Sequence, residues 1–470
     1  MDFDLIVLGL GPGGEDLAEQ VAKAGKSVLG IDERLVGGEC PYFGCIPSKM
    51  ILRAADVLAE SRRVDQLAGH ASDEPDFGVV AERISSEATD DWDDRVAVER
   101  LEESGATFRR GSGKLAGRDD QGRLLVEVGG ETHTAAAVAV ATGTRPSVPP
   151  IDGLDGLETG VDGPVWTNRE ILRTKTAPRS MVVLGGGVIS CELAQGFARF
   201  GTAVTLVEQG ARLLGREEPE AGEVLQQVFA DGGITVRCGQ AVNKVEAGAG
   251  GIAGVQVRLA DGSTVTGEKL LLAAGRTPNL DHIGLETVDL DPSAHQLDVD
   301  NHMQVQDADG STVDGLFAIG DVTGKGPFTH VSVWQARVLG AHLLRRDEPF
   351  GGYDAMAWAT FTDPEIGRVG MSEQQARDAG LSVKVGVQQI ASNSRGWIYG
   401  AGNAGFIKVV QDADTGLLVG ATTCGPHGGE LIGMLTLAVH AKVPVSTMLT
   451  MHYVFPTLHR GVLEALQALA

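Results

Sequence analysis

Two stretches of the chain repeat one pattern: an apolar run, a glycine cluster, a helical stretch and a second apolar run that ends in an acid. The first joins LIVL at 5–8 to GLGPGG at 9–14 and ends at Asp32, and the second joins MVVL at 181–184 to GGGVIS at 185–190 and ends at Glu208. In each, the acid lies 18 positions beyond the last motif residue (32 − 14 and 208 − 190). This matched spacing predicts two β-α-β units.

Each predicted unit carries the groups that bind a dinucleotide. Glycines let the backbone approach a pyrophosphate, the helix N-terminus donates N–H groups to it, and the acid accepts hydrogen bonds from ribose hydroxyls. The binding residues expected on this basis are Gly9, Gly11, Gly14, Asp32, Gly185, Gly187 and Glu208. The alternative is a glycine cluster that only forms a tight turn, and Ser190 in place of a third glycine weakens the second motif.

Two dinucleotide folds predict either two dinucleotides or one cofactor and one cosubstrate. The carboxylate of Glu208 would accept a hydrogen bond from a ribose 2′-hydroxyl and repel a 2′-phosphate, which favours NADH over NADPH. Arg212 lies nearby in the sequence and could soften this preference, which leaves NADPH as the alternative.

Cys40 and Cys45 flank a short segment that contains Pro41 and Gly44. These two residues bend the chain and could bring the sulfurs within bonding distance. Apolar spacing after Cys45 predicts a helix in which Lys49 shares a face with Cys45. A helix N-terminus and an ammonium group both stabilise a thiolate, so we expect a lowered pKa for Cys45. The spacing favours a redox-active pair, with a metal site or two buried thiols as alternatives.

Length, charge and cysteine usage narrow the class of protein. A chain of 470 residues suggests about three domains, and a net charge of −24 argues against a nucleic-acid partner. Five cysteines are too few for a secreted disulfide scaffold, and we expect Cys191, Cys238 and Cys424 to be small core residues. No run of about 20 apolar residues predicts a membrane span, and the N-terminus is typical of a strand, not a signal peptide. These features favour a cytoplasmic protein.

The order of the motifs resembles the class I pyridine nucleotide–disulfide oxidoreductases, the family of dihydrolipoamide dehydrogenase, glutathione reductase and mercuric reductase. The similarity covers essentially the whole chain. Besides the two glycine motifs, it rests on GGEC…CIPSK at 37–49, ATGTRP at 141–146, AGRTPN at 274–279, GLFAIGD at 315–321 and FTDPEI at 361–366.

The resemblance implies an α/β fold with two Rossmann-like domains, which bind FAD and NAD(P), and an α+β C-terminal dimerisation domain. The implied boundaries are 1–147 with 277–345 for FAD, 148–276 for NAD(P) and 346–470 for dimerisation. It adds cofactor-binding roles for a further set of residues and implies a homodimer. These residues are Gly38, Lys49, Thr142, Gly143, Gly275, Gly320 and Asp321.

The family's chemistry is a relay in which NADH reduces FAD, the flavin reduces a disulfide, and the dithiol reduces a small-molecule acceptor. Carried over by position, Cys45 faces the flavin and Cys40 meets the acceptor. Lys49 would lie beside the flavin and pair with Glu192.

The C-terminal segment departs from the family's pattern. Phe455 stands where the family has its catalytic histidine, and Arg460 where it has the paired glutamate. Phenylalanine cannot move a proton, so ordinary disulfide reduction should be impaired unless another base serves. The neighbouring candidates are His452, Tyr453 and His459. The absence of cysteines near the C-terminus disfavours mercuric reduction, and a retained family geometry would give a cis Phe455–Pro456 bond.

A second departure is Glu39, where the family usually has a threonine near the FAD phosphates. A carboxylate there would be repelled by phosphate unless it turned away. These changes indicate an acceptor other than a typical small disulfide. Two further functions remain as alternatives: an NAD(P)H:quinone or dye reductase, and a non-catalytic FAD-binding redox sensor.

Overall fold

The first apolar run forms a buried strand at the centre of a parallel sheet, as its composition predicts. In the computed structural model, which describes residues 2–248, 254–346 and 348–469, β1 (Asp2–Leu8) pairs in parallel with β2 (Val28–Asp32) and β6 (Glu131–Val140). Leu5 to Leu8 are almost fully buried, as expected of a central strand in a parallel sheet whose two faces are both covered. The chain divides into two units, which are described separately.

Unit 1 comprises Met1–Pro47, Arg83–Ser147 and Arg276–Gly352. Its eight-stranded sheet has the central order β17-β18-β6-β1-β2-β3. The remaining strand bounds are β3 Thr107–Arg110, β4 Lys114–Arg118, β5 Leu124–Val128, β17 Gln304–Gln306 and β18 Thr312–Ala318. A two-stranded ribbon pairs β7 (Thr144–Pro146) with β16 (Arg276–Pro278).

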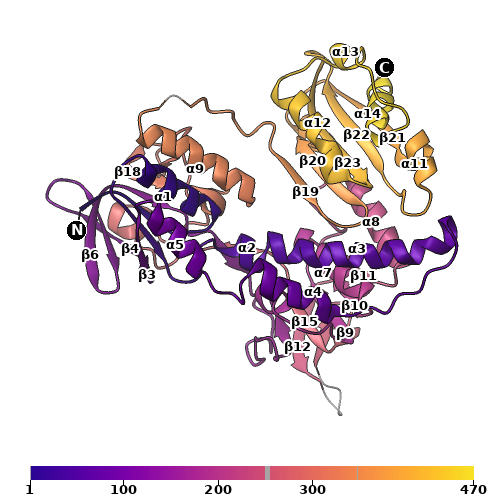
Figure 1. Cartoon of the computed structure of the whole chain (residues 1–470), viewed down its shortest axis with the longest axis horizontal. Helices are drawn as coiled ribbons and strands as arrows, with labels where there is room; N and C mark the ends of the chain where they lie inside the picture. The colour runs from indigo at the N-terminus through magenta and orange to yellow at the C-terminus, as the bar shows by residue number, and fades with distance from the viewer. Residues whose placement is uncertain (1, 249–253, 347, 470) are drawn as a thin grey trace. The chain divides into compact units, whose positions relative to one another are not determined.

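Helices α1 (Pro12–Lys23) and α9 (Thr329–Leu343) pack side by side in unit 1 (Figure 1). Pro12 suits the first turn of α1, where its missing N–H costs nothing. Gly14 of α1 packs against the turn that follows β1, because a Cβ there would lie 2.1 Å from the carbonyl oxygen of Gly9. The other helices of this unit are α2 Glu39–Phe43, the π-helix Ile84–Ala88, α5 Arg95–Glu103, and the 3₁₀ turns Leu285–Val288 and Gly320–Thr323.

Unit 2 comprises Ser48–Glu82, Val148–Gly275 and Tyr353–Ala470. Its first sheet is parallel, with the order β11-β10-β9-β15-β8, and holds the second predicted β-α-β unit as β9 (Ser180–Leu184), α7 (Val188–Arg199) and β10 (Ala203–Val207). The other elements around this sheet are β8 Val165–Trp166, α6 Asn168–Ile171, α8 Pro219–Asp231, β11 Thr235–Arg237 and β15 Lys269–Leu272. A three-stranded antiparallel sheet joins β12 Val242–Ala247, β13 Val255–Leu259 and β14 Thr264–Gly267.

Helix α3 (Cys45–Leu67) starts at the second cysteine, as the apolar spacing predicts, and lies beside α7 in unit 2 (Figure 1). Gly196 of α7 leaves room for Ile51 of α3, since a Cβ there would be 3.1 Å from the Ile51 side chain. Helix α4 (Phe77–Arg83) packs the ring of Phe77 at 4.9 Å from that of Phe197 in α7. These contacts fix α3 and α4 against α7 of the second predicted β-α-β unit.

The C-terminal part of unit 2 is an antiparallel sheet with the order β19-β20-β23-β22-β21. Its strands are β19 Ala357–Thr360, β20 Glu365–Gly370, β21 Val383–Gln389, β22 Phe406–Asp412 and β23 Leu417–Gly425. Its helices are α10 Glu373–Asp378, the 3₁₀ turn Ile390–Ser392, α11 Ser394–Tyr399, α12 Gly428–His440, α13 Val445–Met448 and α14 Leu458–Gln467.

The expected fold class is confirmed: two Rossmann-like units of structure and a C-terminal antiparallel sheet with helices. The residue boundaries of three domains stay predictions. Among the helices that the structure describes, none is both long enough and apolar enough to cross a membrane.

Candidate active site

The residues predicted to bind FAD gather at one edge of the sheet in unit 1. Gly9, Thr142 and Gly320 follow the carboxyl ends of β1, β6 and β18, which are neighbours in the sheet. Ligands of open α/β sheets bind at this edge. Asp32 ends β2 and accepts hydrogen bonds from the backbone N–H of Leu10 (2.8 Å) and Arg34 (2.7 Å). Burial raises the pKa of the Asp32 carboxyl, and these two backbone donors oppose that shift.

The space around the glycine turn fits a bound pyrophosphate. A Cβ on Gly11 or on Gly143 would meet no atom within 4 Å, so the backbone at both positions faces open space. Gly38, with φ of 68°, packs directly on the turn, because its Cβ would lie 2.7 Å from the Cα of Gly11. Thr142 is fixed by Asn279, whose side chain donates to the Thr142 carbonyl at 2.8 Å. This cradle of exposed backbone is the arrangement that a dinucleotide needs.

Glu39 pairs with Arg276 at 3.2 Å. The Arg276 guanidinium also donates to the hydroxyl and the carbonyl of Thr144, each at 2.7 Å. Thr144 in turn donates to the Asp321 carboxylate at 2.6 Å. The arginine therefore offsets the charge of Glu39 and also holds the threonine that bonds Asp321, which explains how a carboxylate is tolerated at position 39.

The second predicted nucleotide site, in unit 2, repeats the geometry of the first predicted site. Glu208 accepts hydrogen bonds from the backbone N–H of Gly186 and of Gly210, which have the same sequence offsets from the acid as Leu10 and Arg34 have from Asp32. Gly185 approaches the strand that precedes Gly275, since its Cβ would lie 2.4 Å from the Ala273 carbonyl oxygen.

Two further features complete this second site. A Cβ on Gly187 would meet nothing within 4 Å, so this glycine faces open space as Gly11 does. Ser190, which stands where a third glycine was expected, is fully buried and donates its hydroxyl to Ala273 at 3.1 Å. The substitution therefore keeps the close packing of helix and strand.

The guanidinium of Arg212 points at its own loop. It donates to the backbone carbonyls of Leu214 (2.9 Å), Gly215 (2.9 Å) and Glu217 (3.0 Å). An arginine whose terminal nitrogens are bonded in this way is not oriented to receive a 2′-phosphate.

The two cysteines of the predicted redox pair meet where two helices abut. Cys40 lies in the short helix α2, and Cys45 is the first residue of α3. Both are thiols in the structure, and a side-chain hydrogen bond joins them. The Cys45 sulfur lies 3.5 Å from the hydroxyl of Thr329, at the start of α9, and the same hydroxyl bonds Cys40. The two thiols therefore interact with each other and with the same hydroxyl.

The Cys40 thiol has a raised pKa. The hydrogen bond to Cys45 is the largest cause, burial is the second, and the charge of Cys45 adds to both, whereas Thr329 opposes the shift. Cys40 therefore keeps its proton when the pair loses its first one. Burial also raises the pKa of Cys191, and that of Cys424 to about 12, as expected of inert core thiols. The expectation for Cys238 was wrong: it is half-buried, because it lies after the edge strand β11.

In unit 2, Lys49 forms an ion pair with Glu192 at 2.7 Å. Glu192 is 3% exposed and also accepts the backbone N–H of Phe361 at 2.8 Å. The Phe361 ring lies 4.8 Å from the Lys49 ammonium group. The pair that the resemblance implies is thus present, and Phe361 holds both partners; its role beside a flavin stays a prediction.

In the described part of the C-terminal segment, two of the three candidates for the missing base already contact neighbouring residues. Phe455 is exposed, lies under the guanidinium of Arg460 at 5.5 Å, and precedes a cis bond to Pro456. Tyr453 is buried and donates to the Met448 carbonyl at 3.1 Å, and His459 contacts Met434 and the Tyr453 ring. Of the three candidates, only His452 is exposed.

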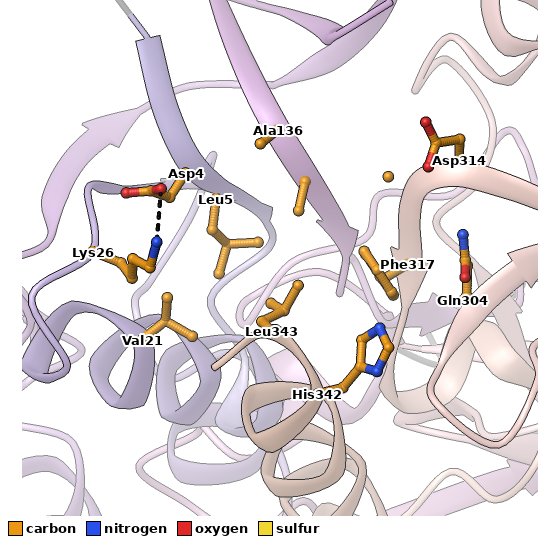
Figure 2. A pocket seen from close by; sticks show the side chains of 12 residues that line it. Asp4, Leu5, Val21, Lys26, Ala136, Gln304, Asp314, Phe317, His342 and Leu343 are labelled. Carbon is orange, nitrogen blue, oxygen red and sulfur yellow. Dashed lines mark hydrogen bonds and ion pairs between the residues drawn. The ribbon is translucent and has the colours of Figure 1, made fainter. Parts of the chain in front are cut away.

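A cavity of about 350 Å³ in unit 1 holds none of the predicted site residues (Figure 2). Lys26 and Asp4 pair on one side of it, and His342, Phe317 and Gln304 lie on the other. It is lined by residues of β1, β6 and β18 that precede the ends of these strands, and none of its lining residues belongs to the glycine turns. In the described ranges, no group of three or more His, Cys, Asp or Glu could hold a metal ion.

Sequence reasoning missed two residues of the unit 1 site. Thr329 contacts both thiols, yet it carries no spacing signal, because it lies 284 positions from Cys45. Arg276 follows Gly275 in a motif that was noticed, but its pairing with Glu39 spans 237 positions. The available sequence signal for a nearby cation was the carboxylate of Glu39, which stands where the family usually has a threonine.

Profiles of two protein families match the chain. The pyridine nucleotide-disulphide oxidoreductase profile matches residues 3–336, and the profile of the dimerisation domain of these enzymes matches residues 356–466. The chain is 33% identical over 476 residues to a dihydrolipoyl dehydrogenase of Thermus scotoductus, which covers 99% of this chain and 97% of the relative. It is 29% identical to the dihydrolipoyl dehydrogenase of Haloferax volcanii, over 98% of this chain and 95% of the relative.

Solved structures show the same fold along the whole chain. The crystal structure of LpdA from Mycobacterium tuberculosis superposes with a TM-score of 0.84 at 26% identity and covers 99% of both chains. The HOCl-induced flavoprotein disulfide reductase RclA from Escherichia coli superposes with a TM-score of 0.82 at 24% identity, over 99% of this chain and 98% of that one. At this identity the second comparison shows the fold alone.

The raised pKa of Cys40 predicts how this thiol reacts once Cys45 is removed. In Cys45→Ala the largest cause of the shift is lost, so the pKa of Cys40 should fall and more thiolate should be present at pH 8. Iodoacetamide should then alkylate Cys40 about threefold faster for each unit by which the pKa falls, because the gain in thiolate is partly offset by its lower nucleophilicity. The rate is measured by mass spectrometry of the peptide that contains Cys40. Cys238→Ala is the control, and an unchanged or slower rate at Cys40 would contradict the assignment.

Proposed function

Because the chain belongs to the pyridine nucleotide-disulphide oxidoreductase family, we propose that it is an NADH-dependent flavoprotein that reduces a small-molecule acceptor with Cys40 and Cys45. The observation that carries this proposal is the hydrogen-bonded meeting of the two thiols at the start of α3. The family binds FAD and NAD(P)H. Bound FAD would supply the step that cysteines lack, accepting a hydride from nicotinamide and delivering an electron pair to sulfur.

The residues that would hold FAD are those at the carboxyl edge of the unit 1 sheet. The turn Gly9–Gly14 and the start of α1 would receive the pyrophosphate, and Asp32 an adenosine ribose. Asp321, fixed by Thr144, would bind the ribityl chain. Gly38, Thr142, Gly143 and Gly320 would line the same cradle.

The nicotinamide dinucleotide would bind at the glycine turn of unit 2, along Gly185, Gly187 and Gly275. Glu208 would accept a hydrogen bond from the 2′-hydroxyl, and the engagement of Arg212 by three carbonyls supports NADH over NADPH. Lys49 and Glu192 would tune the charge beside the flavin. We assign the FAD site to the domain formed by residues 1–147 and 277–345, and the NAD(P) site to the domain formed by residues 148–276.

With a disulfide acceptor, the dithiol would act in two exchange steps. Cys40 attacks one acceptor sulfur, a mixed disulfide forms and the first acceptor thiolate leaves. Cys45 then attacks the Cys40 sulfur, closes the Cys40–Cys45 disulfide and releases the second acceptor thiolate. The two protons of the dithiol end on the two acceptor thiols.

This exchange needs a base to take the Cys40 proton, and Phe455 cannot do so. We infer an acceptor that is not a typical small disulfide. The same observation favours the second candidate, a quinone or dye reductase, in which electrons leave the flavin without thiol exchange.

The match of residues 356–466 to a dimerisation domain supports a symmetric homodimer. Leu437, Val454 and Phe455 of this segment have exposed fractions of 63%, 68% and 64% in the single chain. Apolar side chains so exposed are suited to a contact with a second copy.

Cys45→Ser separates the two enzymatic candidates. NADH should still bleach the flavin under anaerobic conditions, whereas transfer to a dithiol-dependent acceptor should fall at least about a thousandfold, because no disulfide can form. The measurement is a screen of lipoamide, glutathione-type disulfides and quinones, with Cys238→Ser as the matched control. Full acceptor turnover by the variant would contradict the dithiol role and support the quinone reductase.

Glu208→Gln tests the assigned cosubstrate. The amide keeps an acceptor for the 2′-hydroxyl and for Gly186 but loses the charge that repels a 2′-phosphate. The ratio of kcat/KM for NADH to that for NADPH should fall about tenfold, which corresponds to a change of about 1.4 kcal/mol. Glu223→Ala, on the exposed side of α8, should leave the ratio unchanged. A wild-type preference for NADPH would refute the assignment outright.

A further inference from the structure

A run of left-handed backbone lies in unit 1, shortly after the π-helix Ile84–Ala88. Asp90, Asp91 and Trp92 have φ of 47°, 52° and 59°. Left-handed residues other than glycine usually occur singly, and a bulky side chain such as that of tryptophan is a genuine outlier there. Such a backbone persists only where its surroundings hold it, and it concentrates at functional sites.

Hydrogen bonds on the preceding π-helix hold this turn. The Asp91 N–H donates to the Ser85 carbonyl at 2.7 Å, and the Ser85 hydroxyl donates to the Asp91 carboxylate at 3.1 Å. Thr89 is 2% exposed and donates its hydroxyl to the Ile84 carbonyl at 3.0 Å. Single π-helical turns are also frequent at functional sites.

The turn delivers the Trp92 indole to the cysteine loop. Its Nε1–H donates to the backbone carbonyl of Tyr42 at 3.1 Å. Tyr42 lies between Cys40 and Cys45 and belongs to the last turn of α2. Carbonyls in the last turn of a helix have no partner within the helix, so this one must be satisfied from outside. Through this hydrogen bond the indole fixes the backbone of the segment between Cys40 and Cys45.

A second bond from the same segment holds the entry to the loop. The Asp94 carboxylate accepts the Val36 N–H at 2.6 Å and pairs with Arg110 at 2.6 Å. Val36 directly precedes Gly37 and Gly38, which lead into α2. The segment 84–94 thus fixes the cysteine loop at its start and at its middle.

We propose that Trp92 is a positioning residue for the Cys40–Cys45 pair, an inference that rests on the redox role proposed above. By fixing the Tyr42 carbonyl, the indole restrains the chain between the sulfurs in the dithiol state. Two thiols that are already held together lose less entropy when they close into a disulfide. Trp92 therefore shifts the equilibrium of the pair toward the disulfide.

Trp92→Phe tests this by removing the N–H and keeping an aromatic ring. The full-length holoenzyme is equilibrated in glutathione buffers, where the pair's disulfide and two reduced glutathiones give the dithiol and oxidised glutathione. Alkylation and mass spectrometry of the peptide with Cys40 and Cys45 then give the equilibrium constant. We expect disulfide formation to be about tenfold less favourable, a potential about 30 mV less negative.

Two variants calibrate the result. Trp397→Phe, on the exposed face of α11, should match the wild type. Trp92→His retains a ring N–H and should lie between the wild type and Trp92→Phe. A constant for Trp92→Phe within about twofold of the wild type would overturn the inference.

The results of this experiment distinguish a failure of the role of Trp92 from a failure of the proposed redox function. If the wild type forms no Cys40–Cys45 disulfide in any buffer, the redox role itself fails. If it forms one and Trp92→Phe behaves identically, only the role of Trp92 fails. Should the variant not fold, hydrogen exchange of residues 84–94 in the wild type decides: exchange should be several-fold slower in the disulfide form than in the dithiol form. Equal exchange in both forms would overturn the role of Trp92.

Discussion

The proposed redox site depends on the way in which α2 ends directly before α3 begins. Helix α2 ends at Phe43, Gly44 breaks the path, and α3 begins at Cys45, so the two sulfurs meet across a single interruption. A continuous helix would place residues five apart on different faces. The break at Gly44 instead lets the two thiols hydrogen-bond to each other and to Thr329. The proposed exchange chemistry and the raised pKa of Cys40 both depend on the contact between the two thiols.

The two proposed nucleotide sites use a carboxylate in the same way. Asp32 and Glu208 each bond one N–H in the glycine turn and one N–H two residues beyond themselves. The acid that would recognise a ribose thus also sets the shape of the turn that would hold the pyrophosphate. Arg276 also fixes charged groups in unit 1. It offsets the charge of Glu39 and donates to the Thr144 hydroxyl, which in turn donates to the Asp321 carboxylate. Charged groups near the expected phosphates are therefore fixed before any ligand arrives.

Local patterns predicted the parts of the fold that short-range physics controls. Apolar runs ended where strands β1 and β9 end, and the spacing after Cys45 gave the start of α3. Contacts between residues far apart in the sequence were predicted only where the family resemblance implied them. Lys49 and Glu192, which are 143 positions apart, are such a pair. The Glu39–Arg276 pair and the contact of Thr329 with the thiols had no such guide. They depend on how loops pack, which periodicity does not encode.

Electron counting tests the central claim that the sulfurs store electrons beside the flavin. Anaerobic titration of the purified holoenzyme with dithionite, followed by absorbance, gives the number of electrons that each chain takes up. A flavin and a working disulfide should together accept about four electrons, two for each centre. Uptake of about two electrons by fully oxidised protein, equal to the flavin alone, would contradict the account.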